Sequence, residues 1–338
     1  KRYILVFESI FYFLFVIIRH FRAKDIIMGR NPEVSYGTYS LLSFDELWKK
    51  SGFDESEHMF SVRTRSADEE YGNGVHQWYC GMQDAGGVLQ KGPWVGNRFH
   101  WYCLFDNEDY RITRGVKHRF QYDSQVKNGR GYYYPGTPEY KLMATGKNMD
   151  DVKVQEPVAP FNDGLTYTNS ISSNCLAFTT KYADVTDPTI GRTDAYWPFL
   201  RYADIVLIYA EAQCELNDGI SQDAIDALND IRIRSNAKEA SVTGDGAIET
   251  KVELRSVIFE ERAKELAYEG DRRWDLLRWG IYLDVMNSLG GINEDGTRTP
   301  YDEGSINKRR EFRHLLYPLP SLEVSTNMAI DKNNPGWN

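Results

Sequence analysis

The sequence predicts a mainly α-helical fold in which helical repeats frame an irregular, loop-rich insertion with a few short strands. Two observations predict it. Apolar residues recur at helical spacing between residues 201 and 268. From residue 65 to 166 that periodicity is lost, and glycine, aspartate, asparagine and aromatic residues dominate. We therefore expect one domain with an N-terminal helical part (1–64), a loop-rich ligand-binding insertion (65–195), and a C-terminal helical part with an extended tail (196–338).

The N-terminal residues are almost entirely apolar from Tyr3 to Ile18, interrupted only by Glu8 and Ser9. This run is short for a membrane span, which needs about 20 residues. Phenylalanine and tyrosine fill the positions where a signal peptide would carry the small residues of its cleavage site. We expect a helix buried among other helices. A residual targeting segment and a membrane span remain alternatives.

Two elements are expected before the insertion. Ser43 stands three residues before Glu46, the spacing of a helix-capping pair, which predicts a short helix from Phe44 to Lys50. The segment that follows is typical of a strand. Extended segments or short strands are expected at residues 56–62, 116–122 and 174–178.

A pair of helices is expected from Arg201 onward. Gly219 ends the first helix, and Ser221 caps the second. At about 35 residues, the pair has the size of one tetratricopeptide-type repeat. The apolar positions at helical spacing are Ala203, Val206, Leu207, Ala210 and Cys214 in the first helix, and Ala224, Ile225, Leu228 and Ile231 in the second.

A longer helix is expected next, because Thr250 and Glu253 form the pattern of a capping box. It should run through Tyr268 and end at Gly270, and another helical turn should follow. The tail from residue 312 to 338 holds several prolines, which cannot continue a helix. We expect this tail to lie extended over the body.

The charge balance and the cysteines limit the partners and cofactors. The formal net charge is -9, whereas nucleic-acid binding needs a basic surface. None of the four cysteines forms a C-x-x-C pair, and none of the six histidines has metal-ligand spacing. We therefore expect no nucleic acid, no metal and no cofactor. A disulfide between Cys80 and Cys103 remains open, since spacing alone does not decide it.

The sequence carries no familiar catalytic motif. H-E-x-x-H, G-x-S-x-G, a phosphate-binding loop and G-x-G-x-x-G are all missing. Two carboxylates brought together from loops could still act as they do in glycosidases, and Asp106, Glu108 and Asp109 are candidates. A solvated acidic turn is the favoured interpretation of these three residues, so we expect no enzyme.

Residues 259–280 crowd charges of both signs among aromatic residues. On a helix, Glu261, Glu265 and Glu269 lie one turn apart on one face. Such carboxylates could serve acid–base catalysis. Arginines interleave with them, however, and guanidinium groups pair readily with carboxylates. A structural ion-pair network is therefore favoured over a catalytic pair.

Three ordered motifs carry a family resemblance. They are Glu261-Arg262, Glu265-Leu266, Glu269-Gly270, Arg272, Asp275-Leu276 and Arg278-Trp279-Gly280; the segment from Phe199 to Gln213; and Tyr317-Pro-Leu-Pro320, Glu323, Asn327 and Asn334-Pro-Gly-Trp337. Together they resemble the C-terminal part of the SusD-like (RagB/SusD) family of outer-membrane nutrient-binding lipoproteins. The resemblance implies a SusD-like fold.

The resemblance also implies a function. Members of the family are non-catalytic, cell-surface lipoproteins of the outer membrane that bind an oligosaccharide or glycan and deliver it to a SusC-like TonB-dependent transporter. They carry lipid on a cysteine near the N-terminus, whereas the first cysteine here is Cys80. We therefore expect that part of the N-terminal region, with its lipid anchor, is missing from this chain. A protein-interaction scaffold or a peptide-binding member is the alternative, and a glycosidase is the third.

Aromatic residues make up 14% of the chain, and many of them fall in the insertion. An aromatic ring can cover the apolar face of a sugar while polar neighbours bond its hydroxyl groups. The candidate ligand-binding residues are Trp78, Tyr79, Gln83, Trp94, Asn97, Arg98, Trp101 and Tyr133. We expect at least two of the three tryptophans to be exposed together in one depression. Taken singly, each of them is better explained as an anchor of the core or of a loop than as a ligand platform.

Overall fold

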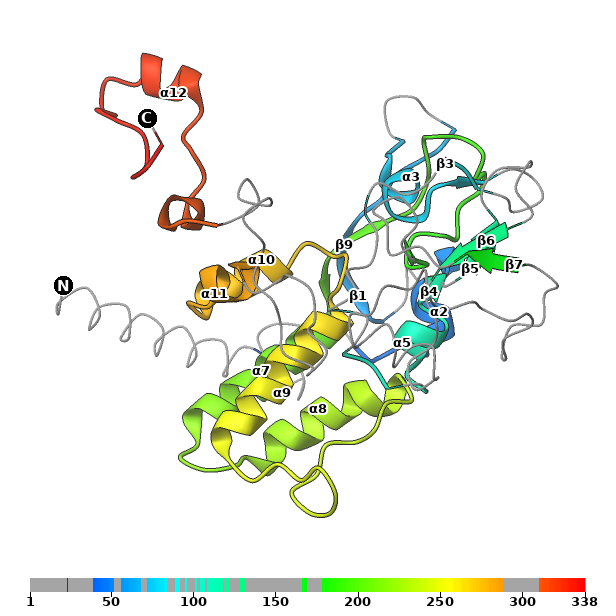
Figure 1. The fold of residues 1–338 in the computed structure, drawn as a ribbon, viewed down its shortest axis with the longest axis vertical. Helices are drawn as coiled ribbons and strands as arrows, with labels where there is room; N and C mark the ends of the chain where they lie inside the picture. Colours follow the sequence, from blue (N-terminus) through cyan, green and yellow to red (C-terminus); the bar gives the residue numbers. More distant parts are fainter. Residues whose placement is uncertain are drawn as a thin grey trace. The chain divides into compact units, whose positions relative to one another are not determined.

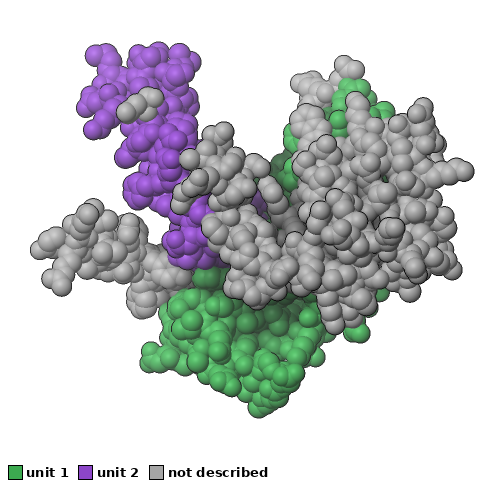
Figure 2. Space-filling model, in the orientation of Figure 1, with its two compact units in different colours: residues 1–140, 149–269 green, residues 141–148, 270–338 purple. Residues whose placement is uncertain are grey.

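The computed structural model describes residues 23, 39–51, 56–67, 72–83, 89–91, 95, 101, 104–106, 108–117, 119–121, 128–131, 166–168, 178–287 and 310–337. The chain forms two compact units (Figure 2). Unit 1 comprises residues 1–140 and 149–269, and unit 2 comprises residues 141–148 and 270–338. The expected apolar helix at 3–18 lies outside the described residues. Within the described residues, no helix combines the length and the hydropathy that crossing a bilayer requires.

Three helices of unit 1 pack together as a bundle (Figure 1). They are α7 (Tyr202–Leu216), α8 (Gln222–Arg234) and α9 (Lys251–Glu265), and each packs against the other two. The apolar residues predicted from helical spacing are buried between them. The prediction of a helix-rich fold with few short strands is confirmed.

Two of the three helix starts follow from capping chemistry. The Ser221 hydroxyl accepts the Ala224 N–H at 3.3 Å. Thr250 accepts the Glu253 N–H at 3.1 Å, and the Glu253 carboxylate accepts the Thr250 N–H at 3.0 Å, so the predicted capping box is present. Helix α9 ends at Glu265, before the predicted Tyr268. The backbone leaves the helix early because Tyr268 itself adopts a left-handed conformation, with φ of 68°.

The expected short helix before the insertion is α2 (Phe44–Leu47), which ends before the predicted Lys50. Ser43 occupies the N-cap position, but its hydroxyl donates to the Glu46 carboxylate at 2.7 Å. It therefore caps no backbone N–H, contrary to the prediction. Phe44, Leu47 and Trp48 bury their side chains together beneath this turn.

The expected strand at 56–62 is β1 (His58–Val62), which pairs antiparallel with β9 (Trp197–Arg201). The sequence did not indicate β9. Its five residues show no regular alternation of buried and exposed positions, and the helix follows directly at Tyr202, so no period-two pattern marks the strand.

The insertion holds short helices and small sheets (Figure 1). The helices are α3 (Val75–Cys80) and α5 (Tyr110–Thr113). The sheets pair β2 (Met82–Gln83) with β3 (Leu89–Lys91), β4 (Val116–Lys117) with β8 (Phe178–Thr179), and β5 (Arg119–Gln121) with β6 (Asn128–Gly131) and β7 (Thr166–Thr168). The strand predicted at 116–122 is thus two strands in different sheets. Of the strand predicted at 174–178, only residue 178 is described, and it begins β8.

Unit 2 contains α10 (Arg272–Arg278), α11 (Tyr282–Asn287), the 3-10 helix η4 (Phe312–Leu315) and α12 (Ser321–Thr326). The expectation of a fully extended tail is wrong, because η4 and α12 interrupt it. Pro320 precedes α12 at the N-cap position, where a missing N–H costs no hydrogen bond. Pro320 therefore stands at the start of a helix.

Candidate functional site

Helix α3 presents Trp78 to the surface. Val75, His76 and Cys80 face the interior, whereas the Trp78 side chain on the opposite face is 47% exposed. The Trp78 ring lies against Gly74, where a Cβ atom would stand 2.9 Å from the ring. The helix ends at Gly81, whose φ of 74° suits glycine.

An aromatic cluster supports the inner face of α3. It comprises Tyr79, Tyr182, Trp197 and Tyr268, and its rings lie 5.3–5.9 Å apart between centroids. Tyr182 and Trp197 stack nearly parallel, at 8°. The Tyr182 hydroxyl donates to the Tyr268 carbonyl at 2.7 Å. Tyr79, a predicted ligand residue, therefore packs in this cluster while its neighbour Trp78 faces outward.

Trp101 belongs to the same packing. Its ring lies 4.7 Å from that of Phe105 and 5.5 Å from that of Tyr268, between centroids. Its indole N–H donates to the Ala263 carbonyl of α9 at 2.7 Å. This geometry fits an anchor that joins the insertion to α9. The structure thus brings Trp101 to the aromatic cluster that also supports α3.

The remaining predicted residues divide into two groups. Gln83 lies half-buried in β2, and its backbone N–H donates to the Pro188 carbonyl at 3.1 Å. The others lie outside the described residues, so their predicted role stays a prediction; they are Trp94, Asn97, Arg98 and Tyr133.

A polar segment at residues 187–193 runs beside α3, and the sequence reasoning missed it. A Cβ atom on Gly191 would stand 2.8 Å from the Gln77 side-chain oxygen. Asn73, just before α3, pairs its backbone with that of Thr193. Within the segment, Asp187 accepts hydrogen bonds from the backbone and hydroxyl of Thr189 at 2.9 and 2.6 Å.

Both hydrogen bonds lower the pKa of Asp187, and the bond from the Thr189 hydroxyl has the larger effect, so the side chain stays a carboxylate. The side chains that flank the Trp78 helix are therefore acceptors and amides, which suit sugar hydroxyls. The sequence signal was present in the run Asp187-Pro188-Thr189, which is typical of a turn. Because this run is far from Trp78 in the sequence, the sequence alone did not show that the two segments lie side by side.

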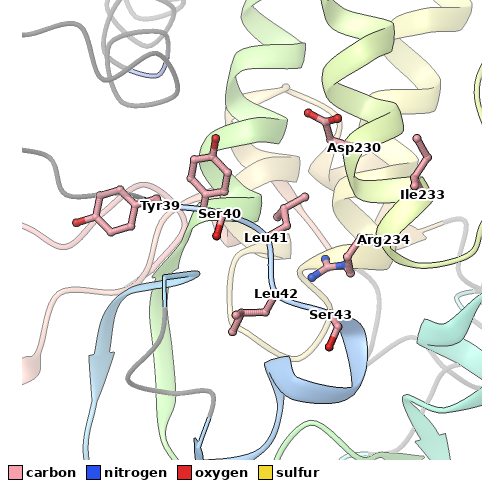
Figure 3. Close-up of a pocket in the computed structure, with 9 residues that line it drawn as sticks. Tyr39, Ser40, Leu41, Leu42, Ser43, Asp230, Ile233 and Arg234 are labelled. Carbon is pink, nitrogen blue, oxygen red and sulfur yellow. The ribbon is translucent and has the colours of Figure 1, made fainter.

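Unit 1 also contains a pocket away from Trp78 (Figure 3). A pocket of about 520 Å³ is lined by Tyr39, Ser40, Leu41, Leu42, Ser43, Tyr202, Asp230, Ile233 and Arg234. These residues come from the segment before α2, the start of α7 and the end of α8. Among the predicted ligand residues that the structure describes, none lines this pocket.

The carboxylates of the 259–280 segment that belong to unit 1 form a buried ion-pair network. Arg201, 1% exposed, binds Glu57, Glu265 and Glu269 at 2.6–3.1 Å. Lys181 binds Glu269 at 2.6 Å. Burial alone would raise the pKa of Glu265, but the guanidinium groups of Arg234 and Arg201 outweigh it and hold that pKa below its ordinary value. The prediction of a structural network is confirmed.

Asp109 joins the same network, against the expectation of a solvated turn. It is buried, accepts the Arg111 N–H at 2.9 Å as N-cap of α5, and pairs with the Arg111 guanidinium at 2.7 Å. Arg111 also binds Glu261 of α9. Asp106 and Glu108 are exposed, as the solvated-turn interpretation predicts.

Cys80 is a free, buried thiol. Its S–H donates to the Thr179 carbonyl at 3.2 Å, and burial raises its pKa to about 12. The disulfide left open at Cys80 is therefore not formed, and this thiol is unreactive at neutral pH. Among the described residues, no group of three or more potential ligands is placed to hold a metal ion.

The fold and these motifs define a member of a known class. A sequence model of the SusD family matches residues 90–337, and the chain belongs to the SusD family. SusD-like protein P2 of Formosa agariphila is 33% identical over 142 residues, which cover 41% of this chain and 25% of that protein.

Solved structures share the fold at low sequence identity. A SusD superfamily protein from Parabacteroides distasonis superposes with a TM-score of 0.60 at 18% identity, over 96% of this chain and 58% of that one. Surface glycan-binding protein A from Bacteroides thetaiotaomicron, solved in complex with laminarihexaose, gives a TM-score of 0.55 at 18% identity, over 98% of this chain and 62% of that one. This chain thus spans less than two thirds of the length of these relatives.

Proposed function

We propose that this chain binds an oligosaccharide on the surface around Trp78, without breaking bonds in it. The observation that carries the proposal is the exposed Trp78 ring on a short helix whose other face is fixed in an aromatic cluster. Hydrogen-bonding groups are supplied by Gln77 on the same helix, by Gln83 on strand β2, and by the Asp187–Thr189 turn. The laminarihexaose complex of one structural relative supports this class of ligand.

The proposal includes a cellular setting. Membership of the SusD family supports a protein at the outer-membrane surface, held there by a lipid anchor, that passes its glycan to a SusC-like TonB-dependent transporter. Such a protein must release its ligand as well as capture it. One or two aromatic stacks, each stabilising by roughly 1–2 kcal/mol, contribute at most about 4 kcal/mol, which corresponds to a dissociation constant of about 1 mM, and such weak binding suits transfer.

Calorimetry with a panel of glycans that includes laminarihexaose tests the proposal. The chain should bind at least one glycan, and Trp78→Ala should weaken that binding about tenfold because one stack is lost. Trp274→Ala is the matched control, since Trp274 is 58% exposed on α10 of unit 2. Equal loss in both variants would contradict the proposal. A reducing-end assay on the same glycans should detect no hydrolysis.

One observation favours a second candidate function, a protein-interaction scaffold or a peptide-binding protein. Phe60 of β1 and Phe199 of β9 are 62% and 58% exposed, and their rings lie 5.7 Å apart between centroids. Exposed aromatic pairs of this kind are common at protein interfaces. If no glycan in the panel binds while the protein retains a transporter or peptide partner, this candidate replaces the first.

A further inference from the structure

The pocket in Figure 3 has the size and lining of a small-ligand site. Its volume of about 520 Å³ is typical of such sites. The Tyr39 and Tyr202 rings lie at one side of it, nearly parallel at 20°, with 6.5 Å between centroids. Leu41 packs against the core of α7–α9, and Ile233, 60% exposed, supplies an apolar wall.

The floor of the pocket is fixed from below by one buried carboxylate. Glu57, which is fully buried, accepts the Leu42 N–H at 2.8 Å and an Arg234 guanidinium N–H at 3.2 Å. Its backbone carbonyl accepts the Tyr202 N–H at 2.8 Å. Each of the three chain segments around the pocket is therefore bonded to the same residue. A preformed site loses little conformational entropy when a ligand enters.

The two charged residues that line the pocket, Arg234 and Asp230, differ in whether they already have an ion-pair partner. The Arg234 guanidinium is already neutralised by Glu57 and Glu265. Asp230, on the rim formed by α8, accepts no hydrogen bond and forms no ion pair with any residue in the described ranges. Burial raises the pKa of the Asp230 carboxyl, and the neighbouring charge of Asp226 adds to that rise. A cation next to Asp230 would favour the ionised carboxylate and so oppose this rise in pKa.

We propose that this pocket binds a primary ammonium group carried on an aliphatic stem, as in a lysine side chain. Asp230 would accept the N–H bonds of the ammonium, and the faces of Tyr39 and Tyr202 would attract its charge. Leu41 and Ile233 would cover the stem. The net charge of -9 favours the approach of a cation. The proposal does not depend on glycan binding at Trp78.

NMR titration with Nα-acetyl-lysine N-methylamide tests the proposal. The corresponding norleucine compound serves as the uncharged probe, because it keeps the stem and lacks the ammonium. The lysine compound should bind with a millimolar constant and shift signals of the pocket residues. The norleucine compound should bind about tenfold more weakly, which is the change expected for the loss of one charge-assisted hydrogen bond.

Two matched variants distinguish a local contact from a general charge effect. Asp230→Asn should weaken binding of the lysine compound about tenfold. Asp226→Asn should weaken it less than about twofold, because Asp226 lies one turn away on α8, outside the pocket lining, accepts from Gln222 at 2.8 Å and acts on the pocket only through its charge. Trp78→Ala should also have no effect. Equal binding of the two compounds, equal loss in both aspartate variants, or no binding of the lysine compound would overturn the proposal.

Discussion

At the scale of single residues, neighbours decide which aromatic side chains can meet a ligand. Trp78 and Tyr79 are adjacent in sequence and have opposite roles. The Tyr79 ring lies 5.3 Å from that of Tyr182 between centroids, within the aromatic cluster, whereas the Trp78 ring lies against Gly74 and Trp78 remains 47% exposed. Trp101 is occupied by its hydrogen bond to Ala263. Composition shows that aromatic residues are numerous. Only their packing shows which rings are exposed to a ligand and which are held in the core.

The Trp78 ring lies against Gly74, which has no side chain, so Gly74→Ala should displace that ring. The added Cβ would stand 2.9 Å from the ring, and the exposed indole can move away without disturbing the core. We expect glycan affinity to fall about fivefold, since part of one stack is lost, while the free energy of unfolding changes little. Calorimetry and chemical denaturation measure the two effects.

Gly219→Ala is the control for this substitution, because a Cβ at Gly219 meets nothing within 4 Å. It should leave glycan affinity unchanged. If Gly74→Ala binds glycan as tightly as the unaltered protein, the Trp78 ring does not contact the sugar in the position described.

At the scale of elements, helix α9 depends on its first turn. Thr250 and Glu253 satisfy each other's backbone N–H groups there. Thr250→Ala should therefore lower the free energy of unfolding by about 1 kcal/mol, measured by urea denaturation. Ser43→Ala is the comparison, because the Ser43 hydroxyl caps no backbone group. An equal loss in both variants would show that the capping box contributes nothing specific.

The elements that the sequence predicted well are those whose signals are local. Helical spacing and caps located α7, α8 and the start of α9. Strand β9 pairs with the distant strand β1, and Arg111, the neighbour that pairs with Asp109, binds the distant Glu261 of α9. No local pattern reveals either of these distant contacts. The same holds for the site. Trp78 was predicted, whereas the Asp187–Thr189 turn reaches α3 only through tertiary packing.

At the scale of the whole molecule, buried charges in unit 1 join elements that are distant in sequence. Arg201 at the end of β9 binds Glu57 next to β1 and Glu265 of α9. Arg111 of α5 binds Glu261, which also belongs to α9. A buried ion pair adds little net stability compared with an apolar pair, but loss of one partner costs about 3–5 kcal/mol. The network therefore specifies how the insertion and the helices of unit 1 fit together.

The stability of unit 1 should fall on acidification in two steps. Burial lowers the pKa values of His58 and His76 below 6.5, so the unfolded chain takes up protons first and stability falls as pH drops below about 6.5. Arginines and Lys181 hold the pKa values of Glu265 and Glu269 below 4.5 despite burial, so a second loss follows as pH drops below about 4.5.

Urea denaturation at pH 7.5, 5.5 and 4.0 measures both steps. Each histidine should contribute a slope of at most about 1.4 kcal/mol per pH unit in the first step. His76→Asn keeps a donor for the Tyr182 carbonyl, which accepts from His76 at 2.8 Å, and removes the titration. A slope unchanged in that variant would show that His76 does not contribute to the first step.

The central claim is that the Trp78 ring contacts sugar while the aromatic cluster beneath it stays fixed. Observation of the tryptophan indole N–H signals by NMR during titration with a bound glycan tests it most directly. The Trp78 signal should shift with saturation, and the Trp101 signal should stay in place because its N–H is held by the Ala263 carbonyl. A glycan that binds without moving the Trp78 signal would contradict the account.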